Sequence, residues 1–207
     1  MKYCVIDTET SGLFDFTKPA DAEGQPRLAC LAMIHLGEDL AETSREEHWI
    51  KPDGWTLSPE VIATHGITNE FLAENGRPVA AALEAYDEVL ASGSIIVAFN
   101  AQYDLKMMRG ELRRAAMPDH FEETKSICVM RDAVNVVKAP KKSGKGFKFP
   151  KLEEACRHFG IGQSQAHSAM SDAESAAAIF RALNALGVLR EPAVYLARVK
   201  PDAHREG

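Results

Sequence analysis

The stretch YCVIDTETSGL, residues 3–13, constrains the fold more than any other part of the sequence. Its apolar beginning predicts a buried β-strand, and Asp7 and Glu9 follow directly. Because side chains alternate between the two faces of a strand, Asp7 and Glu9 share one face, and Thr8 and Thr10 share the other. Two neighbouring carboxylates repel each other, so either one takes up a proton or a cation lies between them. The alternative is that the strand has already ended and both acids are solvated.

The rest of the chain predicts an α/β fold. Further strands are expected at 28–36, 47–51, 94–99 and 125–129, and helices at 78–91, 102–116, 152–159 and 168–187, with a short helix that begins at Ser58-Pro59-Glu60 and ends at HGIT, residues 65–68. Three strands come first and strands alternate with helices afterwards, which predicts a mixed central β-sheet flanked by α-helices. We expect one domain over residues 1–190 and a C-terminal tail over residues 191–207.

The composition is that of an ordinary globular protein. The chain has 207 residues, of which 45% are apolar and 26% are charged. The longest apolar run, near Leu28–Ile34, is shorter than the ~20 residues of a membrane span, and the N-terminus shows no signal peptide. The four cysteines form no C-x-x-C pair, which favours reduced thiols over a disulfide or a zinc site. We therefore expect a cytoplasmic protein that does not contact a membrane.

The charge balance speaks mildly against a nucleic-acid partner, because the net charge is −6. The distribution of charge is uneven, however. Residues 138–151 contain six lysines and no acid. This lysine-rich loop either contacts nucleic-acid phosphates, with Phe147 and Phe149 stacking on unpaired bases, or is a solvated, flexible loop. We favour the contact with nucleic acid.

Two further acids follow predicted structural boundaries. Asp104, in VAFNAQYDLKMM, falls in the first turn of a predicted helix, where an acid also complements the helix dipole. Asp172, in AHSAMSDAES, opens the alanine-rich helix, and His167 precedes it by five residues. Ser171 and Glu174 match the S-x-x-E capping box, so Asp172 has a structural explanation as a first-turn acid, and His167 could be a surface residue. In the functional interpretation, Asp172 binds a metal and His167 is a base beside it.

Together, these acids and the histidine form the set of groups that phosphodiester hydrolysis requires. Two divalent ions about 3.5–4 Å apart clamp the attacking and leaving oxygens, and hard oxygen ligands hold the ions. Mg²⁺ or Mn²⁺ fits such a site better than Zn²⁺, which prefers histidine or cysteine. A histidine can take a proton from water at neutral pH, which a metal-bound carboxylate cannot do. The combination predicts a metal-dependent nuclease.

The motifs DTETSGL, HGIT, NAQYD and HSAMSD resemble, in this order, the motifs of the DEDDh 3'–5' exonucleases, which have the ribonuclease H-like fold. Within that family, the stretch HWIKPDGWTLSPEVIATHGITNEFL is similar in pattern and spacing to the proofreading (epsilon) subunit of bacterial DNA polymerase III. The resemblance covers roughly residues 1–187. The H-x4-D spacing of His167 and Asp172 separates this branch from relatives that use a tyrosine.

The resemblance implies a role for each residue of the site. Asp7, Glu9, Asp104 and Asp172 would hold two Mg²⁺ or Mn²⁺ ions, with Asp7 bridging both, and His167 would be the general base. Thr8, Thr10, Leu13 and His65 would line the pocket for the 3'-terminal nucleotide, and Asn100 and Tyr103 would lie near the penultimate one. His65 could instead simply end a helix before Gly66. The implied enzyme hydrolyses single-stranded or frayed DNA 3' ends to nucleoside 5'-monophosphates.

Three features depart from the pattern of the family. Tyr103 stands where phenylalanine is usual, so its hydroxyl needs a partner. The loop between Leu13 and Leu28 is longer than common, and the lysine-rich loop resembles an insertion. The two loops bear on the range of substrates and leave the chemistry unchanged.

Other functions and partners stay open. An RNA-directed 3'–5' exoribonuclease or oligoribonuclease differs only by contacts to the 2'-hydroxyl. A non-catalytic module that grips a nucleic-acid end is the second alternative, and the intact set of acids and histidine speaks against it. The tail, with Tyr195, Leu196 and Val199, could bind a polymerase or another protein. We favour the simpler interpretation that the tail packs on its own domain or is frayed.

Overall fold

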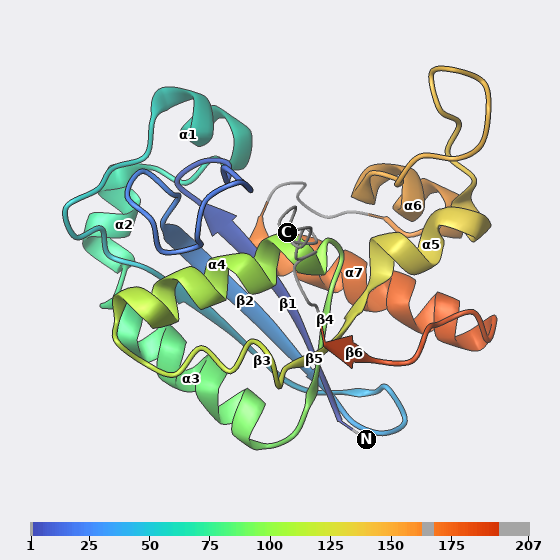
Figure 1. The fold of residues 1–207 in the computed structure, drawn as a ribbon, viewed down its shortest axis with the longest axis horizontal. Helices are drawn as coiled ribbons and strands as arrows, with labels where there is room; N and C mark the ends of the chain where they lie inside the picture. The colour runs from blue at the N-terminus through green and yellow to red at the C-terminus, as the bar shows by residue number, and fades with distance from the viewer. Residues whose placement is uncertain (1, 163–167, 195–207) are drawn as a thin grey trace, which may run out of the picture.

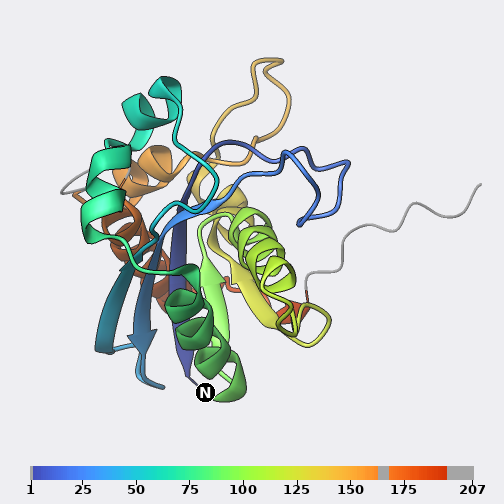
Figure 2. The same ribbon diagram turned by 90° about the vertical axis from the view of Figure 1, so that its left-hand side faces the viewer.

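The computed structural model describes residues 2–162 and 168–194, and its centre is a mixed six-stranded β-sheet. The strands are β1 (Tyr3–Thr10), β2 (Leu28–Leu36), β3 (Glu42–Trp49), β4 (Ile95–Ala98), β5 (Lys125–Cys128) and β6 (Ala193–Val194). The helices are α1 (Pro59–His65), α2 (Asn69–Asn75), α3 (Val79–Ala91), α4 (Ala101–Arg114), α5 (Val129–Val137), α6 (Leu152–Phe159) and α7 (Ala169–Ala185). The helices flank the sheet, which is the predicted α/β architecture (Figure 1 and Figure 2).

Strand β1 lies inside the sheet and is paired on both sides. The strand order is β3-β2-β1-β4-β5-β6. β1 is antiparallel to β2 and parallel to β4, and β4 is parallel to β5. The outer pairs, β2 with β3 and β5 with β6, are antiparallel. β4 pairs with β1 over residues 3–5, and β2 pairs along the whole strand as far as Thr10, so β2 supports the part that carries the acids.

Helices cover both faces of the sheet. α7 packs on β1, β2 and β4, and α5 and α6 pack against α7. α3 and α4 lie together on the other face, where α4 contacts β1. Val5 belongs to the core under α7, and its neighbour Ile6 belongs to the core under α4. The alternation along the strand therefore turns Asp7 and Glu9 toward α7 and Thr8 toward α4.

A buried carboxylate joins α4 to the start of β2. Glu111 is only 1% exposed. It accepts hydrogen bonds from Arg27 Nε (2.8 Å), the Leu28 amide (3.1 Å) and Arg114 Nη1 (3.2 Å). Arg114 also donates to two carbonyl oxygens of the loop 11–27. These contacts fix that loop against α4, which matters because the loop continues directly from the strand that carries the acids.

Two predicted strands differ from the structure by more than one residue at an end. β1 continues to Thr10, so Asp7 and Glu9 lie within a paired strand instead of after it. β3 runs from Glu42 to Trp49 and not over residues 47–51. β3 lies at the edge of the sheet, and its first residues are exposed. Its exposed positions carry polar side chains, so the strand contains no apolar run from which it could be predicted.

Three short elements are absent from the sequence-based prediction. α2 begins after Thr68, whose hydroxyl accepts the Phe71 N–H at 3.1 Å. α5 follows β5 with no intervening loop, so the predicted strand runs one residue into the helix. β6 falls within the predicted tail and pairs with β5, which extends the sheet beyond residue 190.

The predicted capping box of α7 is wrong. Ser168 is the N-cap, and its hydroxyl accepts the Ser171 N–H at 3.3 Å. Glu174 forms an ion pair with Arg45 of β3 instead of reaching back to the helix start. The observed cap lies three residues before the expected one, and Asp172 still falls in the first turn of the helix.

The described residues also bear on the expected compartment. None of their helices is long and apolar enough to cross a membrane. The four cysteines are free thiols, and three of them are buried. The cytoplasmic location stays a prediction.

Candidate active site

Strand β1 and helix α7 bring three carboxylates together. Asp7 and Glu9 extend from β1 toward α7, and Asp172 lies in the first turn of that helix. Each residue offers a carboxylate oxygen, and these oxygens all lie within 4.8 Å of one another. All three side chains are partly buried. The fold therefore assembles acids from the first strand and the last helix, as the sequence predicts.

The fourth predicted acid, Asp104, lies in the first turn of α4 and is 5% exposed. It does not belong to the group of oxygens within 4.8 Å of one another. Its charge nevertheless acts on Asp7, whose pKa it raises. Thr8 Oγ1 donates a hydrogen bond of 2.8 Å to Asp104 Oδ1. The strand thus presents Asp7 and Glu9 on one face, while Thr8 on the other face holds Asp104.

Burial and mutual repulsion raise the pKa values of these acids. Burial, followed by the charges of Asp104, Glu9 and Asp172, holds the pKa of Asp7 well above its usual range. Burial and the charges of Asp172 and Asp104 raise the pKa of Glu9 to about 8. Burial raises the pKa of Asp104 to about 7, although the hydrogen bond from Thr8 lowers it. Without a cation, the site therefore retains protons near neutral pH.

This donor set fits a hard divalent cation. A cation among the carboxylates lets each of them ionise, because it replaces repulsion with attraction. Carboxylate oxygens are the ligands that Mg²⁺ and Mn²⁺ prefer. Asp7, Glu9 and Asp172 supply oxygens close enough together to share one ion.

Two residues predicted to contact substrate meet at the end of β1. The hydroxyls of Thr10 and Tyr103 lie 2.7 Å apart, and each lies within 2.8 Å of the Gly12 carbonyl oxygen. Tyr103 stands where the family usually has phenylalanine, and these contacts supply hydrogen-bond partners for its additional hydroxyl. Leu13 follows with 88% of its surface exposed, so it is accessible to a ligand. The contacts among Thr10, Gly12 and Tyr103 join the end of the strand to α4.

The remaining predicted residues have different surroundings. Asn100 is the N-cap residue of α4. His65 ends α1, and its Nδ1 accepts the Ile67 N–H at 3.1 Å, so this histidine has a structural role. In Figure 1, α1 lies above the end of β1. His167, the predicted general base, lies outside the described residues.

The lysine-rich loop projects beyond α5 and α6 (Figure 1). Lys148 Nζ pairs with both oxygens of Glu154 at 2.6 and 2.7 Å, and Lys151 Nζ lies 3.6 Å from Glu153. These two lysines help to fix the start of α6. The other lysines at the tip, Lys141, Lys142 and Lys145, are exposed and have no ion pair with the described acids.

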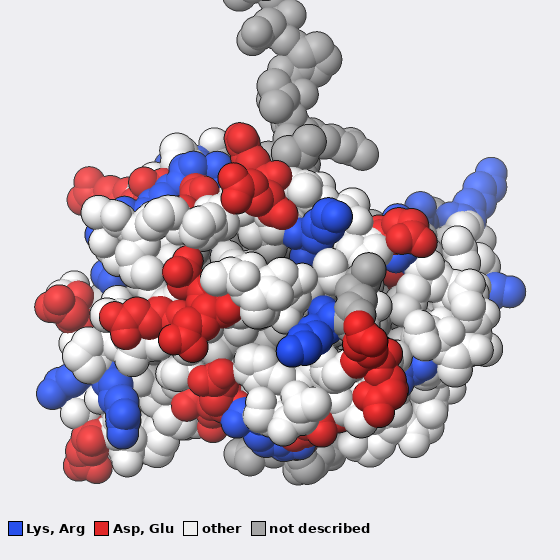
Figure 3. Space-filling model, turned by 90° about the horizontal axis from the view of Figure 1, so that it is seen from below, with Lys and Arg blue, Asp and Glu red and all other residues white. Residues whose placement is uncertain are grey.

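A basic groove escapes the sequence-based prediction. It has a volume of about 1020 Å³, and its cations are Lys18, Lys106, Arg109, Arg113, Arg131 and Arg190. No acid is among the described residues that line it. The signal is visible in retrospect, because Lys106, Arg109 and Arg113 recur at three- and four-residue spacing and share one helix face. By contrast, the face seen from below in Figure 1 carries groups of acidic side chains with lysines and arginines between them (Figure 3).

Solved structures of exonuclease I are similar to this chain over most of its length. The Escherichia coli enzyme in complex with a dT13 oligonucleotide matches with a TM-score of 0.73 and 20% identity, over 88% of this chain and 41% of that one. Exonuclease I from Methylocaldum szegediense matches with a TM-score of 0.72 and 22% identity, over 89% of this chain and 40% of that one. The chain therefore has the ribonuclease H-like fold of these exonucleases, as predicted.

The sequence is also similar to those of named proteins, and a family profile matches most of the chain. The DNA polymerase III subunit epsilon of Haemophilus influenzae is 29% identical over 181 residues, which cover 85% of this chain and 64% of that subunit. Ribonuclease T of Citrobacter koseri is 28% identical over 195 residues, covering 85% of this chain and 81% of that enzyme. The chain thus spans a little under two thirds of the length of the Haemophilus subunit. The profile of the Exonuclease family (RNase_T) matches residues 4–180, and the chain belongs to this family.

Proposed function

We propose that this chain is a metal-dependent 3'–5' exonuclease that releases nucleoside 5'-monophosphates from single-stranded or frayed DNA 3' ends. The observation that carries the proposal is the convergence of Asp7, Glu9 and Asp172, with their oxygens within 4.8 Å of one another. Asp104, held by Thr8, completes the acidic set from α4. This is the arrangement of ligands that a hydrolytic metal site requires.

The residues of the site have distinct roles in this proposal. When bound, two Mg²⁺ or Mn²⁺ ions supply Lewis-acid polarisation of the phosphodiester and a nucleophilic water at neutral pH. Asp7, Glu9, Asp104 and Asp172 hold the ions. His167 would take the proton of the attacking water, because an imidazole can accept a proton near neutral pH and a carboxylate that is bound to a metal ion cannot.

The end of β1 receives the terminal nucleotide in this proposal. Exposed Leu13 contacts the base, and the network of Thr10, Tyr103 and Gly12 fixes the backbone from which Leu13 extends. A base must leave the duplex before it enters such a pocket, so unpaired ends should be degraded faster than paired ends.

DNA is the preferred substrate in this proposal, and RNA is the alternative. The exonuclease I structure with a dT13 oligonucleotide shows a fold relative on DNA, whereas one relative in sequence is named ribonuclease T. Discrimination requires contacts to the 2'-hydroxyl. Several relatives are named DNA polymerase III subunit epsilon, which makes a polymerase the protein partner to test first. The tail residues Tyr195, Leu196 and Val199, predicted as a possible contact, lie outside the described residues.

The test compares DNA and RNA oligonucleotides that have an open or a blocked 3' end, each incubated with Mg²⁺, Mn²⁺ or EDTA. We expect digestion of open 3' ends that EDTA abolishes, with nucleoside 5'-monophosphates as products. Asp7→Ala should abolish turnover and leave the protein folded. His167→Ala should keep metal binding and lower the rate by about 10²–10⁴-fold.

Two results would separate the alternatives. If oligonucleotides with a blocked 3' end are digested as fast as those with an open 3' end, the chain is not an exonuclease that starts at this end. Binding of oligonucleotides without turnover under all metal conditions supports the non-catalytic binding module instead.

A further inference from the structure

The basic groove concentrates positive charge on a chain whose net charge is −6. Asp119 accepts hydrogen bonds from both Arg109 Nε (3.1 Å) and Arg113 Nε (2.5 Å), so one carboxylate serves two guanidinium groups. Arg190 pairs with Asp132 at 3.1 Å. Lys18 also lies 3.8 Å from Asp15, and Arg113 lies 3.7 Å from Asp21. None of these four acids lines the groove, which holds six cations. The groove therefore presents an excess of positive charge to a ligand.

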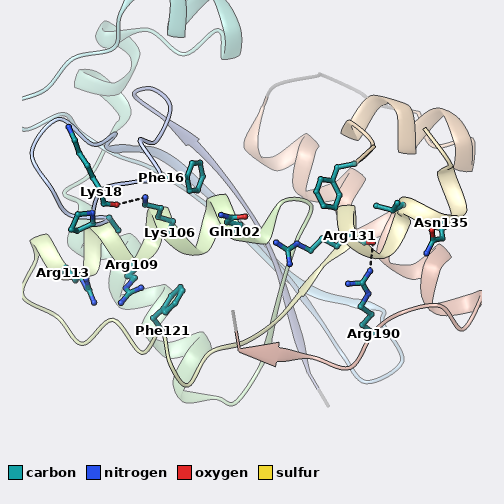
Figure 4. A pocket seen from close by; sticks show the side chains of 14 residues that line it. Phe16, Lys18, Gln102, Lys106, Arg109, Arg113, Phe121, Arg131, Asn135 and Arg190 are labelled. Atoms are coloured by element: carbon teal, nitrogen blue, oxygen red, sulfur yellow. Dashed lines mark hydrogen bonds between the residues drawn. The ribbon is translucent and has the colours of Figure 1, made fainter. Parts of the chain in front are cut away.

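Helices α4 and α5 form the two walls of the groove. Figure 4 shows Gln102, Lys106 and Arg109 along α4, with Arg131 facing them from α5. The volume of about 1020 Å³ lies at the upper end of the range for sites of a single small ligand, which measure about 300–1,000 Å³. An extended, polyanionic ligand fits this shape and charge better than a small metabolite.

Lys106 lies at the centre of the wall and retains a donor for such a ligand. Its Nζ donates to the carbonyl oxygens of Asp15 (3.2 Å) and Lys18 (3.0 Å). Nζ also lies 4.7 Å from the centre of the Phe16 ring. An ammonium group has three N–H donors, so the two carbonyl contacts leave one for an anion in the groove.

Exposed aromatic rings flank the cations. Phe16 is 51% exposed and Phe149, from the end of the lysine-rich loop, is 56% exposed, and both line the groove. Partly exposed rings beside cations are the pattern of single-stranded nucleic-acid sites, where bases stack and phosphates pair. An acidic protein segment would use the cations but would leave these rings exposed to water.

A chain of ring contacts connects the groove to the candidate active site. Tyr103, which bonds to Thr10 at the end of β1, packs edge-on against Phe14 with ring centres 5.3 Å apart. Phe14 in turn lies 5.8 Å from Phe16, the ring that lines the groove. Gln102 lines the groove two residues before Asp104 on the same helix. One strand could therefore occupy both the site and the groove.

We propose that the groove between α4 and α5 binds the single-stranded nucleic acid on the 5' side of the nucleotide being removed. Lys106, Arg109 and Arg131 contact phosphates, and Phe16 and Phe149 stack on bases. This inference rests on the proposed exonuclease function only for the statement that the bound strand lies on the 5' side of the removed nucleotide. Binding of a single strand in the groove does not depend on that function. It predicts that affinity depends on oligonucleotide length.

The test measures binding without turnover. Fluorescence anisotropy in EDTA compares labelled dT12 with labelled dT3 for the wild type, Lys106→Gln/Arg131→Gln and Phe16→Ala/Phe149→Ala. The control is Lys2→Gln/Arg77→Gln, which removes two exposed charges outside the groove. We expect the affinity for dT12 to fall about tenfold in each groove variant, and the affinity for dT3 to fall far less. The salt slope of dT12 binding should decrease by about 1.4 in the charge variant only.

Equal affinity of the control and both groove variants for dT12 would overturn the inference and leave an acidic protein segment as the occupant. Melting temperatures identify a variant that fails to fold, and the other groove variant then decides. A wild type that binds dT12 through the groove but never digests it with Mn²⁺ would contradict the proposed function alone.

Discussion

At the scale of single residues, the charge of Asp104 depends on the Thr8 hydroxyl. Asp104 is almost fully buried, and burial raises its pKa to about 7. The Thr8 hydrogen bond opposes this shift because it stabilises the ionised form. Strand alternation predicts that Asp7 and Glu9 share a face, but no local pattern reveals that Thr8 contacts a helix residue so distant in sequence. The sequence therefore names Asp104 as a candidate ligand but assigns Thr8 to the nucleotide pocket and misses its contact with Asp104.

Thr8→Val tests this role because the two side chains have similar shapes. Without the hydroxyl, ionised Asp104 loses a donor, so we expect about tenfold more Mg²⁺ to be needed for half-maximal activity, equivalent to ~1.4 kcal/mol. Titration of activity against Mg²⁺ measures the change. Thr43→Val, at an exposed position on β3, is the control and should leave the requirement unchanged. A normal Mg²⁺ requirement in Thr8→Val would show that the hydroxyl does not act on the site.

At the scale of elements, apolar periodicity predicts the buried segments well and the polar edges badly. β2 and α6 have the predicted bounds, because β2 is an almost continuously buried apolar run and α6 ends at Gly160 in the left-handed conformation. β3 has polar residues on an exposed sheet edge, and α5 begins at the residue directly after the end of β5, so neither boundary produces a local signal. The lysine-rich loop is an element of mixed role, since Lys148 and Lys151 pair with acids of α6 and the lysines at its tip do not.

Neutralising the tip of that loop separates binding from chemistry. Lys141→Gln/Lys142→Gln/Lys145→Gln should weaken binding of single-stranded DNA and lower the salt slope by about 2, since each lost phosphate contact contributes about 0.7. Turnover at saturating substrate should change little, because none of these lysines belongs to the acidic site. Lys2→Gln/Lys51→Gln/Lys125→Gln removes the same charge from exposed positions elsewhere. If both triple variants keep the wild-type salt slope, the loop does not contact nucleic acid.

At the scale of the whole molecule, the acidic site couples folding to pH. Burial and repulsion raise the pKa of Glu9 from 4.5 to about 8, and burial raises that of Asp104 from 3.8 to about 7. Between about pH 4 and pH 8 the folded chain therefore binds more protons than the unfolded chain. The free energy of unfolding without metal should thus fall as the pH rises through this window, which is the opposite of the usual behaviour of paired carboxylates.

Thermal unfolding in EDTA measures this dependence. The melting temperature should fall by roughly 5–10 °C between pH 5 and pH 8, and Mn²⁺ should restore it at pH 8 because bound cations favour the ionised acids. The double variant Glu9→Gln/Asp104→Asn should lose most of the dependence on pH. A melting temperature that rises with pH in this range would mean that the acids do not repel one another as described.

The most direct test of the central claim is a crystal soaked with Mn²⁺ and a nucleoside 5'-monophosphate, with the anomalous signal of manganese measured. The account predicts anomalous peaks among Asp7, Glu9 and Asp172, with Asp104 alongside, and the phosphate of the nucleotide beside them. Peaks confined to other surface carboxylates, with these four side chains free of metal at saturating Mn²⁺, would contradict it.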